Sequence, residues 1–382
     1  MVQLNFQTDF TLVTAILPKH SVNRIIENAI PEQLVTAVEI SARGSLVSDK
    51  WIQKFLPSVN PEQVVIELIV PDEYADTVMD NFIIAGKLHL SGGGAVYSIK
   101  CDKMLFIKPF NKDITINRIS KQDEDFNYKK GLTGIFCIAQ KDKSDHIARS
   151  AMKDGAPGPT VVFGQGRGIR DKLGLLRIAI SPEKELIRVV VDNYDTEPVF
   201  ESMVTEGKLD TPGMGFIYIM PIQKGLINIA SVFGSKDQLA TNHQIIKAID
   251  DIRGGTAWRA HGAIDAESKD GSKDSKGRKF LSDLIRLSCV TERGKGDWLV
   301  EAAMNAGAPG ASIAYGRKIG GEEQLGKTDI KLSKEVEIIE LTLSPNKVDE
   351  IIAEMVEAAD EDGNEDVYFY TQPVPKALTY LG

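Results

Sequence analysis

A chain of 382 residues is longer than one ordinary core, since domains cluster near ~100–200 residues, so more than one unit is expected. The net charge of -9 argues against general nucleic-acid binding, because an acidic protein gains nothing from releasing phosphate counterions. No apolar run reaches the ~18–20 residues that cross a bilayer, and MVQLNFQTDFTLV does not resemble a secretory signal. The three cysteines form no CxxC pair, so a cytoplasmic protein without disulfides or structural zinc is expected.

The first predicted unit covers residues 1–106 and is the most diverged of three related copies. Its glycine-rich segment AGKLHLSGGG (85–94) parallels EGKLDTPGMG (206–215) at an offset of 121 residues. At an offset of 124, the matching residues are Thr36, Arg43 and Gly44 with Thr160, Arg167 and Gly168. The unequal offsets require a loop of different length between these motifs. Residues 107–130 are polar and are predicted to be a linker.

The second predicted unit, residues 131–226, reads as strand, helix, strand, strand, helix, strand. Apolar and β-branched runs predict strands, a four-residue apolar spacing predicts the first helix, and Thr196 with Pro198 is typical of the start of the second. The predicted elements are Leu132–Ile138, Ser144–Met152, Thr160–Phe163, Glu185–Val191, a helix from Thr196, and Phe216–Met220.

The third predicted unit, residues 280–382, repeats the second at a constant offset of 152. Cys137 matches Cys289, and Gly155-Ala156-Pro157-Gly158 matches Gly307-Ala308-Pro309-Gly310. Residues 227–279 lie between the two units. They are predicted to hold an inserted helix, His243–Arg253, followed by a flexible linker with the run SKDGSKDSKGRK.

The order of elements is that of the ferredoxin-like split βαβ, which leaves one sheet face uncovered. Three units can bury these faces against one another, which is a physical reason for tandem copies. We therefore expect an α+β fold of three tandem ferredoxin-like βαββαβ units that form an intramolecular pseudo-trimer within a monomer.

GAPGPTVVFGQGRG (155–168), a long loop, ELIRVVV and a helix ending in EGKLDTPGMGFIYIMP resemble the nitrogen-regulatory P-II family. The resemblance implies a signal-transduction protein that binds ATP or ADP in clefts between units. It also implies that a loop, Ile169–Lys184 here, contacts a regulated transporter or enzyme.

The resemblance also implies the binding residues. In the second unit they are Thr160, the loop base Gly164, Gly166, Arg167 and Gly168, and the phosphate loop Gly207, Lys208, Gly213 and Gly215. In the first unit they are Thr36, Arg43, Gly44, Gly86, Lys87, Gly92 and Gly94, and in the third unit Ser312 matches Thr160. Glycines let a backbone approach phosphate oxygens, and Arg and Lys add positive charge, although most glycine-rich loops are only turns.

Three departures from the family limit the inference. The family usually has a lysine directly after the last glycine of the phosphate loop, but that position holds Phe216 in the second unit and Ala95 in the first. The family's usual arginines are also absent after Met220. In the third unit, Glu365 and Val367 replace Gly213 and Gly215 within an acidic loop that would repel phosphate. At most two clefts are therefore expected to bind a nucleotide.

No nucleophile, base and acid set is evident, so a regulatory binding protein is expected rather than an enzyme. An enzyme using the same clefts stays an alternative, as does a metal-handling protein of the divalent-cation-tolerance type. The scattered histidines and cysteines argue against the metal alternative, and no metal site is predicted. No transmembrane segment is expected.

Overall fold

The computed structural model describes residues 4–31, 34, 36–44, 62–108, 110, 114–119, 126–168, 182–229, 252, 278–319, 323–324, 331–332 and 334–380. We call residues 1–106, 131–226 and 280–382 the first, second and third segments. The expected helix His243–Arg253 and most of the loop Ile169–Lys184 lie outside the described residues. In the described part of the chain, no helix is both long and apolar enough to cross a membrane.

Each segment contributes four main strands and two helices in the same order. The first holds β1 (Phe10–Pro18), α1 (Val22–Ala29), β2 (Ala37–Gly44), β3 (Glu62–Pro71), α2 (Asp72–Gly86) and β4 (Gly94–Cys101). The second holds β6 (Leu132–Gln140), α3 (Ser144–Lys153), β7 (Thr160–Gly168), β8 (Glu183–Asp192), α5 (Thr196–Gly207) and β9 (Gly215–Ile222). The third holds β11 (Leu281–Glu292), α7 (Gly296–Asn305), β12 (Gly310–Ile319), β15 (Glu335–Leu343), α8 (Val348–Glu361) and β16 (Tyr368–Leu378).

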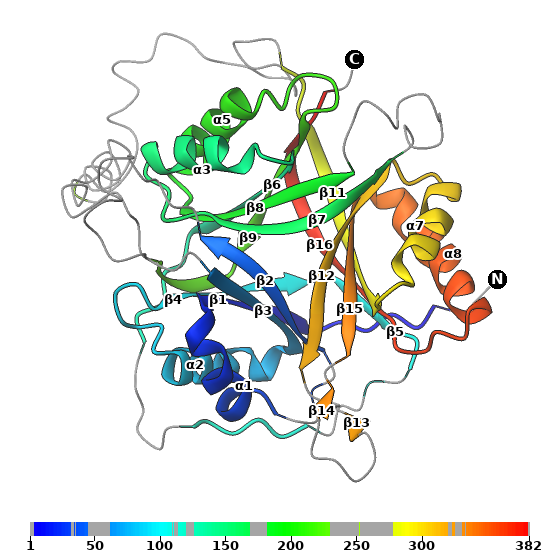
Figure 1. Ribbon diagram of the computed structural model, residues 1–382, viewed down its shortest axis with the longest axis horizontal. Coiled ribbons are helices and arrows are strands. Elements are labelled where there is room, and N and C mark those ends of the chain that lie inside the picture. Colours follow the sequence, from blue (N-terminus) through cyan, green and yellow to red (C-terminus); the bar gives the residue numbers. More distant parts are fainter. Residues whose placement is uncertain are drawn as a thin grey trace.

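Fourteen of the described strands join one antiparallel sheet, in the order β10-β4-β1-β3-β2-β12-β15-β11-β16-β9-β6-β8-β7, with β5 beside β16. Strand β7 pairs with β2 and β12 as well as with β8. The strands β2, β12, β15, β11, β16, β9, β6, β8 and β7 therefore form a closed ring of nine. The three helix pairs α1/α2, α3/α5 and α7/α8 lie outside it (Figure 1).

The predicted fold class, three tandem ferredoxin-like units forming a pseudo-trimer, is wrong. The strands do not form three sheets that only pack together; they are hydrogen-bonded into one closed sheet. Strands β2, β7 and β12 are the outermost strands of their own segments, and they pair with one another. Hydrophobic periodicity shows which face of a strand is buried but not which edges pair, so the sequence could not reveal this closure.

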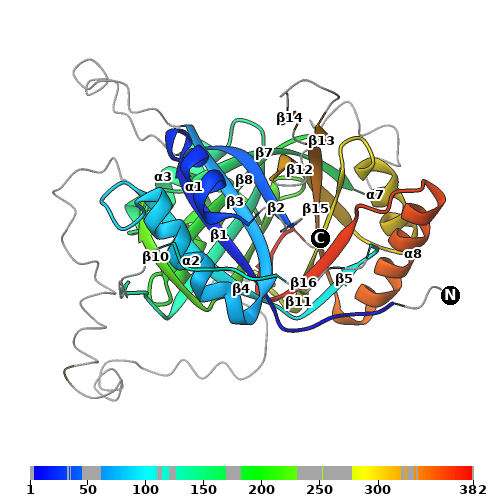
Figure 2. The same ribbon diagram turned by 90° about the horizontal axis from the view of Figure 1, so that it is seen from below.

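Short strands at the segment ends also cross between segments. Strand β5 (Lys103–Phe106) pairs with β16, β10 (Lys224–Asn228) pairs with β4, and the end of β16 pairs with β9. Figure 2 shows β5 beside β16, far from β5 in sequence. Each crossing covers an edge strand of another segment, which removes an exposed row of unpaired backbone groups.

A lysine repeats at each of these crossings. Lys103, Lys224 and Lys376 each bind a carboxylate in the first two turns of another segment's helix, and their respective partners are Asp349 at 2.8 Å, Asp76 at 2.7 Å and Glu197 at 2.7 Å. Each ammonium also lies over an aromatic ring. Lys103 lies 4.7 Å from the ring centre of Phe6, Lys224 lies 4.6 Å from that of Tyr128, and Lys376 lies 4.2 Å from that of Phe280. Because all three crossings carry this contact, we assign it to closure of the fold.

The core has four parts. One cluster lies between sheet and helices in each segment, and the fourth lines the inside of the closed sheet with side chains from all three segments, among them Phe10, Phe136 and Tyr368. Burial of this shared surface couples the segments, because none can unfold without exposing apolar area of the others.

Charged side chains also lie inside the closed sheet. Glu67 on β3, Arg188 on β8 and Glu340 on β15 occupy equivalent positions, at offsets of 121 and 152 residues. Arg188 donates to Glu67 of the first segment and approaches Glu340 of the third at 3.6 Å. All three residues are at most 6% exposed. Arg188 of the second segment thus interacts with a carboxylate of each of the other two segments.

The three cysteines are buried and free. Burial raises the pKa of the Cys101 thiol to about 12 and also raises the pKa values of Cys137 and Cys289. We expect no reaction with a thiol reagent at pH 8 until the protein is unfolded. The folded pKa values exceed the unfolded value of ~8.5, so their contribution to stability is complete below pH ~8.5 and declines above it. Rapid modification without denaturant would contradict this, with the reagent's reaction with free cysteine as control.

Candidate functional site

The two glycine-rich loops, residues 86–94 and 207–215, each close a helix against the following strand. Lys87 and Lys208 are exposed and end α2 and α5 in the left-handed conformation, with φ of 56° and 49°. A cation at this position sits beside the unpaired carbonyls of the helix end. The expected phosphate-binding lysines are therefore on the surface.

Close packing explains most glycines of these loops. A Cβ on Gly94 would lie 2.1 Å from the Ile16 carbonyl oxygen, and one on Gly215 would lie 2.2 Å from that of Ile138. A Cβ on Gly86 or Gly207 would press against the preceding helix of the same segment. Gly92 and Gly213 have φ of 76° and 75°, which favours glycine. The loop pattern is thus accounted for by the fold, with or without a ligand.

The predicted loop base lies at the seam between the second and third segments. Gly164, Gly166, Arg167 and Gly168 form the end of β7 and pair with the start of β12, where Gly166 is in register with Ser312. A Cβ on Gly164 would lie 2.5 Å from the Ile313 carbonyl oxygen. Arg43 and Gly44 likewise end β2 and pair with Val161 and Thr160 at the seam between the first and second segments.

The predicted threonines are buried. The Thr160 hydroxyl donates to Gln63 at 2.9 Å, and the Thr36 hydroxyl donates to the Ile69 carbonyl at 2.7 Å. Thr160, Thr36 and Ser312 are 0%, 1% and 5% exposed. The hydroxyls of Thr160 and Thr36 are thus used within the fold, each in a hydrogen bond to a residue of β3.

The two predicted arginines reach across the seams. Arg43 donates to Asp145 at 2.6 Å and to Ser144 at 2.8 Å, both in the first turn of α3. Arg167 forms a two-pronged pair with Asp297 in the first turn of α7, at 3.0 and 2.8 Å. We call these contacts the first and second arginine seams.

A buried carboxylate supports each arginine seam. Glu185 accepts from the Lys143 and Ser144 amides at the start of α3, and Glu337 accepts from the Gly296 amide at the start of α7. These first amides of a helix are natural anion donors, so each carboxylate occupies the place of a small anion. The carboxylates at these two seams are not among the site residues predicted from the sequence. A signal for them exists, because Asp145 matches Asp297 and Glu185 matches Glu337 at the offset of 152.

The third seam, between β12 and β2, has a different chemistry. Ile319 stands at the position of Arg167, and Val64 at that of Glu185. Both are buried and belong to the core of the first segment. Apolar packing has replaced the arginine–helix pair and its supporting carboxylate, and the ion pair that crosses this seam is Arg317 with Glu39, at 2.8 Å between β12 and β2.

The acidic loop of the third segment folds onto the end of its own β12. Lys318 binds both oxygens of Asp366, at 2.6 and 2.7 Å, and Asp362 pairs with Lys295 at 2.5 Å. At an offset of 152, Lys318 and Asp366 correspond to Gly166 and Met214 of the second segment. In the third segment the loop before the last strand and the end of the second strand therefore meet through an ion pair, whereas the second segment has an uncharged residue at both positions.

The second segment lines up several candidate residues in one row across the sheet. Gly215 is in register with Ala139, Ala139 with Glu185, and Glu185 with Phe163. Three strand spacings separate the ends of the row by about 14 Å. Phe163 is 51% exposed, and the Arg43 guanidinium lies 5.7 Å from its ring centre. Loop 207–215 and the loop base thus lie at one end of the sheet without touching.

An open groove of about 520 Å³ lies at the opposite end of the second segment and includes Thr133, Asn193 and Pro221. None of the predicted binding residues lines it. Among the described residues, no three His, Cys, Asp or Glu side chains gather closely enough to hold a metal ion.

Comparison with protein-family models finds no match, and comparison with curated proteins finds none. Among solved structures, the chain is similar to Arabidopsis thaliana PII bound to citrate, with 17% identity, a TM-score of 0.20, and coverage of 25% of this chain and 79% of that one. The chain is also similar to aspartate kinase from Synechocystis, with 8% identity, a TM-score of 0.21, and coverage of 96% of this chain and 44% of that one. A third similar structure is a microcompartments protein from Desulfitobacterium hafniense DCB, with 12% identity, a TM-score of 0.17, and coverage of 64% of this chain and 94% of that one. TM-scores of this size do not establish a shared fold or function.

Proposed function

We propose that this chain is a P-II-like regulatory protein that binds a small anionic ligand, expected to be an adenine nucleotide, in its second segment. The ligand lies between loop 207–215 and the end of β7. The protein controls a partner transporter or enzyme through the loop Ile169–Lys184, as members of the nitrogen-regulatory P-II family do. The protein binds this ligand without turning it over.

One observation carries the proposal: the Lys318–Asp366 pair of the third segment. It places an anion on a cation in the space between loop and strand end. In the second segment the same two positions are Gly166 and Met214, so neither charge is present. A ligand can bring the anion there, with Lys208 on one side and Arg167 on the other.

Phe163 supports the choice of an adenine nucleotide. Its exposed ring lies in the same row as Gly215 and beside the Arg43 guanidinium. An aromatic face next to an arginine suits a flat nucleobase. Phosphates at loop 207–215 and a base at Phe163 would then span the row.

The arginine seams offer a way to transmit binding. Arg167 is held by Asp297 of the third segment, and only Gly168 separates it from the loop Ile169–Lys184. A bound phosphate would compete with Asp297 for this guanidinium, because a carboxylate and a phosphate each present two oxygens that can accept a pair of parallel N–H bonds. Release of Asp297 would loosen the seam where the loop begins.

Thermal-shift measurements with ATP, ADP, AMP and cyclic AMP test ligand binding. A nucleotide at 100 times its Kd stabilises the native state by ~2.7 kcal/mol, so a rise of several degrees in Tm is expected. Product analysis after prolonged incubation should show intact nucleotide. The absence of a shift with all four compounds would overturn the proposal, and steady turnover would favour an enzyme.

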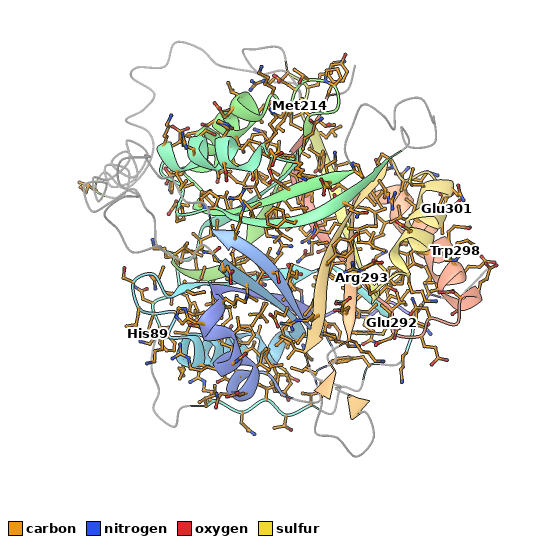
Figure 3. All side chains as sticks on the ribbon, viewed as in Figure 1. His89, Met214, Glu292, Arg293, Trp298 and Glu301 are labelled. Carbon is orange, nitrogen blue, oxygen red and sulfur yellow. The ribbon has the colours of Figure 1, made fainter. Side chains whose placement is uncertain are left out.

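Substitution of Met214 locates the site. Met214 is half-buried in loop 207–215 (Figure 3), so a polar replacement is tolerated by the fold. Met214→Asp copies the third segment's carboxylate and is expected to weaken nucleotide binding more than about 10-fold by charge repulsion. Met214→Asn has the same shape without the charge and should change affinity much less. Equal affinities of the two variants, measured by calorimetry, would place the ligand elsewhere.

A further inference from the structure

Two adjacent strands of the third segment carry a polar patch that faces the inside of the closed sheet. Arg286 and Ser288 on β11 are in register with Gln372 and Tyr370 on β16. None of the four is more than 1% exposed. Among the described residues the buried Ser288 Oγ has no hydrogen-bond partner, and Arg286 lies 5.7 Å from the ring centre of Phe136.

The fold does not require polar side chains at these positions. The pair equivalent to Arg286 and Gln372 is Leu12 and Ile99 in the first segment, and Gly134 and Met220 in the second. Three of these residues have apolar side chains and Gly134 has no side chain, yet the same strands pair in both segments. Burying a guanidinium and an amide costs free energy unless their hydrogen bonds are made, so the patch calls for a further explanation.

Hydrogen-bond donors are left over in this patch. Arg286 donates from Nη1 to Gln372 Oε1 at 3.0 Å and from Nη2 to Glu340. Among the described residues, Arg286 Nε and Gln372 Nε2 have no acceptor, although both atoms are buried. Arg188 Nη2 comes no closer to an acceptor than 3.6 Å from Glu340. All three groups are donors, so the missing partner is an acceptor.

We propose that the inside of the closed sheet binds one small hydrogen-bond acceptor, a halide-sized anion or a water molecule, against Arg286 Nε and Gln372 Nε2. The guest is small because apolar side chains of all three segments surround the patch. The two arginines and the two glutamates, Glu67 and Glu340, balance in charge, so either an anion or neutral water is compatible. This site is separate from the proposed nucleotide site.

Crystals of the full chain grown in sodium bromide test the proposal. A peak of anomalous scattering at hydrogen-bond distance, about 3 Å, from Arg286 Nε and Gln372 Nε2 would identify the guest as an anion. Ordinary density there without anomalous signal would identify it as water. A map that resolves ordered water elsewhere but shows neither feature at this position would overturn the proposal.

A substitution taken from the second segment provides a second check. Gln372→Met installs the residue that Met220 represents there and removes one donor, so the guest's density should be lost. Met220→Leu is the matched control on β9 and should keep it. The wild-type crystal decides the proposal by itself if the Gln372 variant does not fold.

Discussion

Replacing Arg188 by methionine is expected to lower the free energy of unfolding by ~3–5 kcal/mol, because Glu67 then stays buried without its cation and Glu340 keeps only Arg286. Methionine has a similar length, so the loss reports the charge more than a cavity. The measurement is unfolding by denaturant, followed by circular dichroism and by tryptophan fluorescence. Separate transitions for the two signals would show that the segments unfold independently.

Two companion variants make this result interpretable. Glu67→Gln added to Arg188→Met removes one uncompensated charge and should recover part of the loss. Lys347→Met removes an exposed pair with Glu350 and should change stability by no more than ~1 kcal/mol. A cost of Arg188→Met as small as that of Lys347→Met would show that the buried charges do not hold the segments together.

The same network predicts sensitivity to acid. Burial alone would raise the pKa of Glu340, but the guanidinium groups of Arg286 and Arg188 hold it below its usual value. The stabilisation is therefore complete above the unfolded glutamate value of ~4.3 and is lost as the pH falls through the lower folded pKa.

Replacing Gly94 by alanine is expected to cost about 3 kcal/mol or more of the free energy of unfolding. Gly94 has φ of 131°, and a Cβ there would lie 2.1 Å from the Ile16 carbonyl oxygen. The backbone of β1 cannot move away without breaking its pairing with β3 and β4. Thermal and denaturant unfolding would measure the change.

Gly294→Ala is the matched control. Gly294 also has a positive φ, of 87°, but no atom lies within 4 Å of its Cβ position. Only backbone strain is added there, about 1 kcal/mol. If the two alanine variants were equally stable, the glycine of loop 86–94 would not be explained by packing, and a ligand role for it would gain support.

The contrast between the three seams bears on how the chain works. The lysine contacts at Lys103, Lys224 and Lys376 occur at all three crossings between segments, as a requirement of the fold should. The contact between an arginine and the first turn of a neighbouring helix occurs at two seams. At the third seam Ile319 and Val64 stand in place of that arginine and its supporting carboxylate, and Arg317 pairs with Glu39 instead. Paired replacement is what physics demands, because one buried charge without its partner would be costly. The first two seams therefore carry an arginine–helix contact, whereas the third combines apolar packing with the Arg317–Glu39 ion pair.

Much of the local structure can be predicted from the sequence. The offsets of 121 and 152 residues relate the segments, and the glycine and apolar patterns indicate where helices end and strands begin. Arg43 and Arg167 could be singled out because the pairs Arg43-Gly44 and Arg167-Gly168 match at an offset of 124 residues and resemble the loop base of the P-II family. The sequence also distinguishes the acidic loop of the third segment from the glycine-rich loops, because Glu365 and Val367 occupy the positions of Gly213 and Gly215.

The closed sheet, the carboxylates that receive Arg43 and Arg167, and the charges inside the ring were decided only by the tertiary structure. Pairing of β2, β7 and β12 joins edges that are distant in sequence, and the hydrophobic pattern of a strand is the same whichever edge pairs. Asp145 and Asp297 look like ordinary surface residues until the neighbouring segment brings an arginine to them. The sequence by itself therefore determined the elements and their buried faces, whereas long-range strand pairing determined which residues meet.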